Sequence, residues 1–183
     1  KIHDLFYKRE ISYSDISDKE FFILPILLKD NELFIFSNNY FYENWNKIKK
    51  DDQIEFILPL ENIEIIQKIN QSKINLLEID INSIFNEYQN KNVAIIFIED
   101  SDSKEKKIFF KTKIENKIIS KSFISKKNNY GEEILNNQII LEIKGQITNL
   151  VKSQNLINLR TPSFLNVKLN LDDKNNLVLL NSK

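Results

Sequence analysis

Three short runs of continuous apolar residues divide the first hundred positions of the chain. They cover residues 21–28 (FFILPILL), 54–60 (IEFILPL) and 93–98 (VAIIFI). Runs of this length are typical of strands that are buried on both faces of a sheet. Proline cannot donate to a strand ladder, so we expect Pro25 and Pro59 where pairing stops or at a sheet edge. The three runs predict the central strands of one sheet.

The stretches between these runs have the spacing of short amphipathic helices. Residues 37–39 (Ser-Asn-Asn) can cap a helix that ends near Lys49 and Lys50, and Asp80 can cap another that ends at Asn90. The apolar faces of the three predicted helices are Phe41, Trp45 and Ile48; Ile63, Ile66 and Ile69; and Ile81, Ile84, Phe85 and Tyr88. Because helices lie between the strands, right-handed crossovers predict that the three strands are parallel.

The rest of the chain predicts hairpins and one long helix. Residues 33–36 follow an Asp-Asn turn and form a further strand, and 108–114 and 118–124 flank a second turn as a hairpin. A helix over 132–152 carries one apolar face, made of Leu135, Ile139, Ile143, Ile147 and Leu150. Alternating residues at 165–171, a turn, and 177–180 predict a C-terminal hairpin.

These elements predict an α/β fold, with α+β as the alternative. A mixed sheet contains the buried parallel strands, helices pack on it, and the antiparallel hairpin extends it. We divide the chain into a domain at 1–158 and a C-terminal hairpin at 159–183, which either begins a second unit or pairs onto the sheet edge. Trp45 is expected to be buried with Phe41 and Ile48 against the strands at 21–28 and 54–60.

Composition narrows the classes of function. The chain has 183 residues, with 26 basic and 26 acidic side chains, and arginine occurs only at positions 9 and 160. A balanced charge with few arginines disfavours a nucleic-acid partner. The chain has no cysteine, one histidine (His3) and two glycines, which argues against thiolate catalysis, zinc sites and glycine-rich phosphate loops. No apolar run approaches the roughly 20 residues of a membrane-spanning helix, and no signal peptide is visible.

Two groups of residues are candidate sites. Glu99, Asp100 and Asp102 follow the third buried strand, where ligands of open α/β sheets bind, and three carboxylates could hold a divalent metal. The alternative is a solvated loop that its neighbouring lysines neutralise. Tyr40 and Tyr42 cannot both face inward with Trp45, so they are candidate binding residues, and we expect truncation of Tyr42 to change stability little.

Four segments of the chain carry a family resemblance. YSDISDKEFFILPILL, NYFYENW, IEFILPLENIE and FNEYQNKNVAIIFIED, over roughly 21–100, resemble the bacterial family called domain of unknown function 2066. The pattern INSIFNEY…VAIIFIED, followed by a hairpin and a helix from Glu132, resembles the N-terminal domain of the periplasmic protein TolB. The resemblances imply an extracytoplasmic bacterial protein without known enzymatic activity, and they transfer no catalytic residue.

We therefore expect a non-catalytic domain of the bacterial envelope, which acts as a scaffold or protein-interaction module. It would need no cofactor and would contact another envelope protein through an exposed sheet edge or the face of Tyr40 and Tyr42. The alternative is a hydrolase or transferase that uses a divalent metal at Glu99, Asp100 and Asp102. A third possibility is a lipid or peptidoglycan binder with an aromatic groove.

Overall fold

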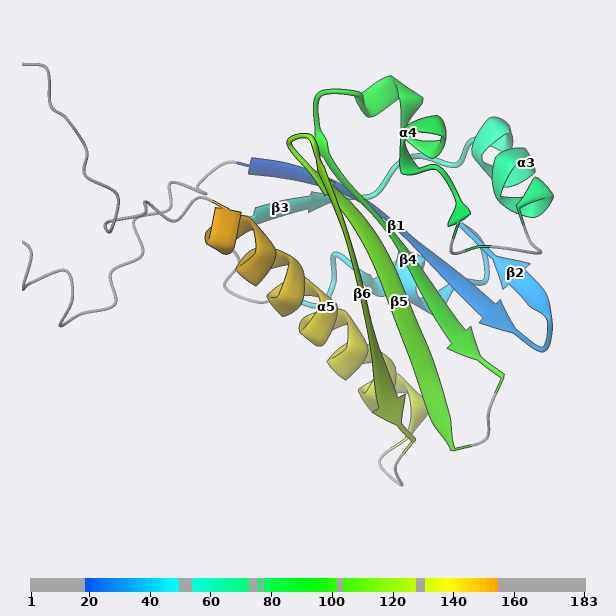
Figure 1. The fold of residues 1–183 in the computed structure, drawn as a ribbon. Coiled ribbons are helices and arrows are strands. Elements are labelled where there is room, and N and C mark those ends of the chain that lie inside the picture. Colours follow the sequence, from blue (N-terminus) through cyan, green and yellow to red (C-terminus); the bar gives the residue numbers. More distant parts are fainter. Residues whose placement is uncertain are drawn as a thin grey trace, which may run out of the picture.

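The computed structural model describes residues 19–49, 54–72, 76, 78–101, 104–127 and 131–154. The predicted C-terminal hairpin, His3 and Asp102 lie outside these residues, as does the boundary between 158 and 159. The described residues form one six-stranded mixed sheet with helices on both faces (Figure 1). The predicted fold class, a mixed sheet with buried parallel strands and packed helices, is confirmed.

The strands follow the order β2-β1-β4-β5-β6, and β3 also pairs with β1. β1 runs parallel to both β3 and β4, as the intervening helices predict. β5 and β6 form an antiparallel hairpin, and β6 ends the sheet. The strands are β1 (Lys19–Lys29), β2 (Glu32–Phe34), β3 (Ile54–Ile57), β4 (Asn92–Asp100), β5 (Glu105–Ile114) and β6 (Lys117–Lys126).

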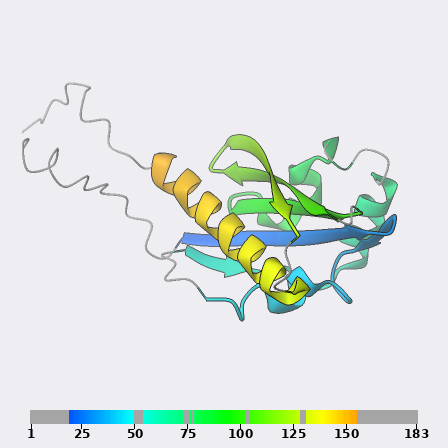
Figure 2. The ribbon, with the colours of Figure 1, turned by 90° about the horizontal axis from the view of Figure 1, so that it is seen from below.

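The helices form a layer on each face of the sheet. They are α2 (Tyr40–Asn44), α3 (Ile63–Gln71), α4 (Ile81–Ile84) with a following 3-10 turn η2 (Asn86–Tyr88), and α5 (Glu132–Gln154). α5 lies diagonally across one face, while α3 and α4 cover part of the other (Figures 1 and 2). Two separate hydrophobic cores result, because alternate residues of β1 and β4 point to opposite faces.

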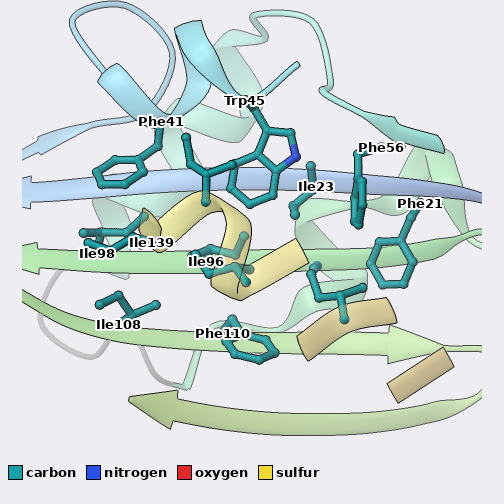
Figure 3. Packing of buried hydrophobic residues seen from close by; sticks show 14 of the residues in the cluster. Phe21, Ile23, Phe41, Trp45, Phe56, Ile96, Ile98, Ile108, Phe110 and Ile139 are labelled. Atoms are coloured by element: carbon teal, nitrogen blue, oxygen red, sulfur yellow. The ribbon is translucent and has the colours of Figure 1, made fainter. Parts of the chain in front are cut away.

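The core beneath α5 contains Phe41 and Trp45, the aromatic side chains that the sequence places on the inner face of the first predicted helix. Trp45 and Phe41 are fully buried, and the Trp45 ring meets Phe56 of β3 edge to face with centroids 6.2 Å apart (Figure 3). Lys144 of α5 donates to the carbonyl of Ile48 at 2.8 Å and lies 5.8 Å from the centre of the indole ring. The predicted burial of Trp45 is confirmed.

Pro25 occupies a position in β1 where no strand pairs with one side. β4 pairs with β1 along 21–29, whereas on the other side β3 pairs only with 19–22 and β2 only with 27–29. The side-chain amide of the buried Asn39 fills this gap and donates to the carbonyl of Pro25 at 2.9 Å. A proline is tolerated here because its missing N–H faces the gap. Pro59 lies beyond the end of β3, so both prolines mark interrupted pairing, as expected.

Several predicted elements have different bounds. β2 ends at Phe34 rather than residue 36, and α2 ends at Asn44 rather than near residue 49. The Asn39 amide nitrogen also lies 2.9 and 3.0 Å from the carbonyl oxygens of Phe34 and Ile35, so its two N–H groups are shared among three carbonyls, and this ends the strand by occupying its backbone acceptors. The side-chain carbonyl oxygen of Asn39 accepts from the Phe41 N–H at 3.1 Å, which starts the helix.

The inner face of α3 and the end of α4 also differ from prediction, whereas the predicted apolar face at Ile81, Ile84, Phe85 and Tyr88 packs in the core. The prediction is wrong for Ile63, which is 70% exposed, and it misses Ile65, which is buried; Ile69 is buried and Ile66 is partly buried against the same core, as predicted. A spacing of four residues keeps Ile65 and Ile69 over the sheet, whereas a spacing of three drifts around the helix. α4 ends after Ile84 because Phe85 leaves helical geometry (φ −103°, ψ 40°) and is itself buried in the core.

Candidate functional site

Tyr40 and Tyr42, the predicted binding residues, are both partly buried and hydrogen-bonded inside the domain. The Tyr40 hydroxyl donates to Asn137 of α5 at 2.7 Å, and the Tyr42 hydroxyl donates to the carbonyl of Pro59 at 2.8 Å. Burial, reinforced by a nearby glutamate in each case, raises the pKa of both phenols. The two rings therefore anchor α2 to its neighbours on opposite faces of the sheet.

Glu99 and Asp100, the predicted metal ligands, lie on opposite faces of the sheet because they are consecutive residues of β4. Glu99 is 3.9 Å from Lys107, and Asp100 is 2.9 Å from Lys106 beneath the start of α5. The structure does not bring these two carboxylates together. Asp102 lies outside the described residues. Within the described residues, no three side chains of the types that bind metals gather at one point.

Asp100 instead belongs to a polar cluster in which Asp100, Lys106 and Asn136 are buried and Lys127 and Glu132 reach the surface; we call these five residues the Lys106 cluster. The Lys106 side chain is 1% exposed, and its Nζ lies 2.9 Å from Asp100, 3.0 Å from Glu132 and 2.9 Å from Asn136. The other oxygen of Asp100 is 2.6 Å from Lys127. Burial alone would raise the pKa of Asp100, but the two lysines outweigh it and lower that pKa. The cluster joins β4, β5 and the first turn of α5.

The outer edge of the β5–β6 hairpin, formed by β6, is open among the described residues. β6 pairs with β5 along its ten residues, and no described strand pairs with its other side. The Ile119 carbonyl accepts from the Thr112 hydroxyl, and the Lys127 N–H donates to the Lys104 carbonyl, so odd-numbered backbone groups face β5. In an antiparallel strand these directions alternate. The N–H and C=O groups of the even-numbered residues 118, 120, 122 and 124 therefore face outward.

An apolar groove of about 700 Å³ lies beside this edge. Its lining includes Leu28, Phe97, Phe109 and Ile124, with Glu99 and Lys107 also at its wall. Among the helices that the structure describes, α3 and α4 cover β1 and β4 on this face, and neither extends over the outer part of β5 and β6 (Figure 1). Ile118 and Ile124 of β6 are 53% and 58% exposed there. We call the β6 backbone edge together with this groove the β6 edge site.

Sequence reasoning anticipates an exposed sheet edge but does not identify β6 as that edge. One signal is present in the printed sequence: β6 alternates so that Ile118 and Ile124 fall on the row opposite Ile119 and Phe123. A strand that carries isoleucine on both rows, with only one row covered by a helix, leaves apolar surface exposed. To apply that signal one must know which strand of the hairpin lies at the edge of the sheet, and the hairpin sequence does not give that order.

Comparisons with known proteins give no family assignment. No family model matches the chain, and no curated protein matches it. One solved structure, of an uncharacterised protein, is 5% identical over 75% of this chain and 92% of the other, with a TM-score of 0.26. Another, from Xanthomonas campestris and described as domain of unknown function 330, is 8% identical over 76% and 84%, with a TM-score of 0.31. Likenesses at this level bear on neither fold nor function.

None of the helices in the described part of the chain is both long and apolar enough to cross a membrane.

Proposed function

We propose that this domain is a non-catalytic protein-interaction module that binds a partner through the β6 edge site. The observation that carries the proposal is the row of outward-facing backbone groups at alternate residues of the ten-residue strand β6, which an apolar groove flanks. An unpaired strand edge is a template for an added strand, whose backbone hydrogen bonds supply affinity while pockets for alternate side chains supply specificity. The β6 edge site is thus our proposed contact surface for the interaction role that the sequence predicts.

The candidate residues that the structure describes support a non-catalytic role. Tyr40 and Tyr42 use their hydroxyls inside the domain, and each oxygen of Asp100 lies against a lysine. A carboxylate held in its charged form by two cations is poorly suited to accept or deliver a proton near neutral pH. The metal-dependent reading would need Glu99 and Asp100 on one face of the sheet, and they lie on opposite faces.

Site-specific photo-crosslinking in the cell tests the proposal. A photoreactive benzoylphenylalanine in place of Ser122, which lines the β6 edge site, should give one discrete crosslinked product. The same residue in place of the exposed Glu64 on α3 should give none. Ser120→Pro should abolish the Ser122 product because proline removes an outward-facing N–H. No product from position 122, or the same product from both positions, would refute the proposal.

We also propose that the domain works in the bacterial envelope. The support is the resemblance of residues 21–100 to the domain of unknown function 2066 family and of the later half to the TolB N-terminal domain. Fractionation of the source bacterium, with detection of the native protein, tests this. Recovery with periplasmic or membrane-associated markers is expected, and recovery with cytosolic markers would contradict it.

A further inference from the structure

The charges of β6 indicate what kind of strand it can accept. Its ten residues include three exposed lysines, Lys117, Lys121 and Lys126, and no acidic residue. None of the three makes an ion pair with the residues that the structure describes. Lys117 and Lys121 share the α5 face of the sheet, because odd-numbered residues of β6 lie on that face with Ile119 and Phe123. A row of positive charge therefore borders one face of the open edge.

The other face of the same edge is uncharged over most of its length. It presents Ile118, Ser120, Ser122 and Ile124, and the apolar groove begins beside Ile124 and Ser122. The two faces thus differ in chemistry: Lys117 and Lys121 lie toward α5, on either side of Ile119, whereas the other face is apolar or serine up to Ile124 and is charged only at its end, at Lys126.

A strand added to β6 would match this alternation. Side chains directly opposite each other on adjacent strands lie about 4.5–5.5 Å apart, and opposite charges at such positions stabilise the pair. From this we infer that the occupant is an extended segment of another protein in which acidic and apolar residues alternate. The acidic row would lie against Lys117 and Lys121, and the apolar row would enter the groove. This inference rests on the proposed function and specifies the partner's chemistry.

Charge disfavours two other occupants. A second copy docked edge to edge would place the lysine rows of both chains together on one face of a continuous sheet, an arrangement that protects edges against self-association. The chain's own segment 165–171 (LNVKLNL) carries a lysine and no acidic residue in its polar row. A nucleic acid would use the lysines but would leave the groove and the outward backbone groups without a role.

Peptide binding to the full chain tests the inference. The probe is a fluorescein-labelled ten-residue peptide in which glutamate and valine alternate, compared with a peptide of alternating lysine and valine and with a single-stranded oligonucleotide of ten nucleotides. The readout is fluorescence anisotropy at low and at high salt. The glutamate peptide should bind at least about tenfold more tightly than the lysine peptide, and high salt should reduce the difference.

Matched variants locate the binding on β6. Ser120→Pro should abolish binding and Ser120→Thr should retain it, since only proline removes the outward N–H. Ile124→Asn should weaken binding several-fold, whereas Ile118→Asn, on the same row but outside the groove lining, should weaken it less. Circular dichroism confirms that each variant is folded.

The outcomes separate the two proposals. Equal binding of both peptides, tighter binding of the oligonucleotide, or binding indifferent to Ser120→Pro would overturn the inference about an acidic partner. Loss of the in-cell crosslink at position 122 would overturn the proposed function itself. A crosslink at 122 to a partner segment without alternating acidic residues, identified by mass spectrometry, would leave the interaction role intact and refute the acidic strand.

Discussion

Replacing Lys106 by methionine removes the central charge of the Lys106 cluster while keeping an unbranched apolar stem. The Lys106 and Asp100 side chains are 1% and 4% exposed, so neither can turn to bulk water when its partner is lost. Lys106→Met leaves Asp100 with Lys127 alone and leaves the Asn136 oxygen without its donor. Breaking a buried pair costs about 3–5 kcal/mol when the remaining charge is left uncompensated, and because Lys127 still pairs with Asp100 we expect the lower end, about 3 kcal/mol. That is a large part of the roughly 5–15 kcal/mol that stabilises a domain.

Urea unfolding followed by circular dichroism measures this cost. At about 2–4 °C per kcal/mol for a chain of this size, Lys106→Met should also lower Tm by roughly ten degrees. Asp100→Leu alone should cost a similar amount, because it leaves the Lys106 ammonium buried with fewer partners. The double variant should lose much less than the sum of the two, since no unpaired charge remains at the centre. Additive losses, or single losses below about 1 kcal/mol, would refute the reasoning.

Three further predictions follow from the packing and the charges. Trp45→Ala should lower the free energy of unfolding in urea by about 3–5 kcal/mol. Trp45→Phe should lower it by less than its lost volume implies, because the buried indole N–H has no acceptor among the described residues. Equal losses of stability in the two variants would contradict this. Tyr42→Phe should cost about 1 kcal/mol by loss of the bond to the Pro59 carbonyl, and an unchanged urea midpoint would contradict it. The lowered pKa of Asp100 means that its contribution is complete above its ordinary value of 3.8 and is lost as pH falls through the lower folded-state value; acid unfolding curves should show this loss in the wild type and a smaller one in Lys106→Met.

The central strands and the long helix could be predicted from the sequence because burial there leaves a strong pattern. β1 and β4 are covered on both faces, so their sequences are nearly continuous apolar runs. One face of α5 packs on the sheet, and the buried residues of that face recur at intervals of three or four positions. These patterns depend only on local sequence and the presence of a core.

The Lys106 cluster could not be read in the same way. Lys106 lies in the segment KEKK, where it looks as solvated as its neighbours, yet it occupies the inward row of β5 with Ile108 and Phe110. Its period of two with those residues is the signal that could have identified it. Its partners Glu132 and Asn136 lie 26 and 30 residues away, and only the docking of α5 brings them to it.

Tyr42 shows the same limit on the other face. The sequence predicts a surface position because Tyr40 and Tyr42 cannot both face the same core as Trp45, and that argument considers only one core. The sheet has two cores, and α2 lies at the gap between β3 and β2, so Tyr42 packs on Phe36 in the second core, with ring centroids 5.2 Å apart. A short helix at a sheet edge can bury side chains on both faces, which periodicity alone does not reveal. For this reason Tyr42→Phe is expected to be destabilising, whereas the sequence predicts little effect even for truncation.

Residue-resolved amide hydrogen exchange on β6 of the full chain tests the central claim most directly. The odd-numbered amides of Ile119, Lys121 and Phe123 face β5 and should be protected, whereas the even-numbered amides of 120, 122 and 124 face outward and should exchange rapidly. Addition of the glutamate–valine peptide should protect the even-numbered amides while the odd-numbered ones change little. Even-numbered amides that are already protected in the chain alone, or that stay unprotected with saturating peptide, would contradict the claim that β6 is an open edge for a partner strand.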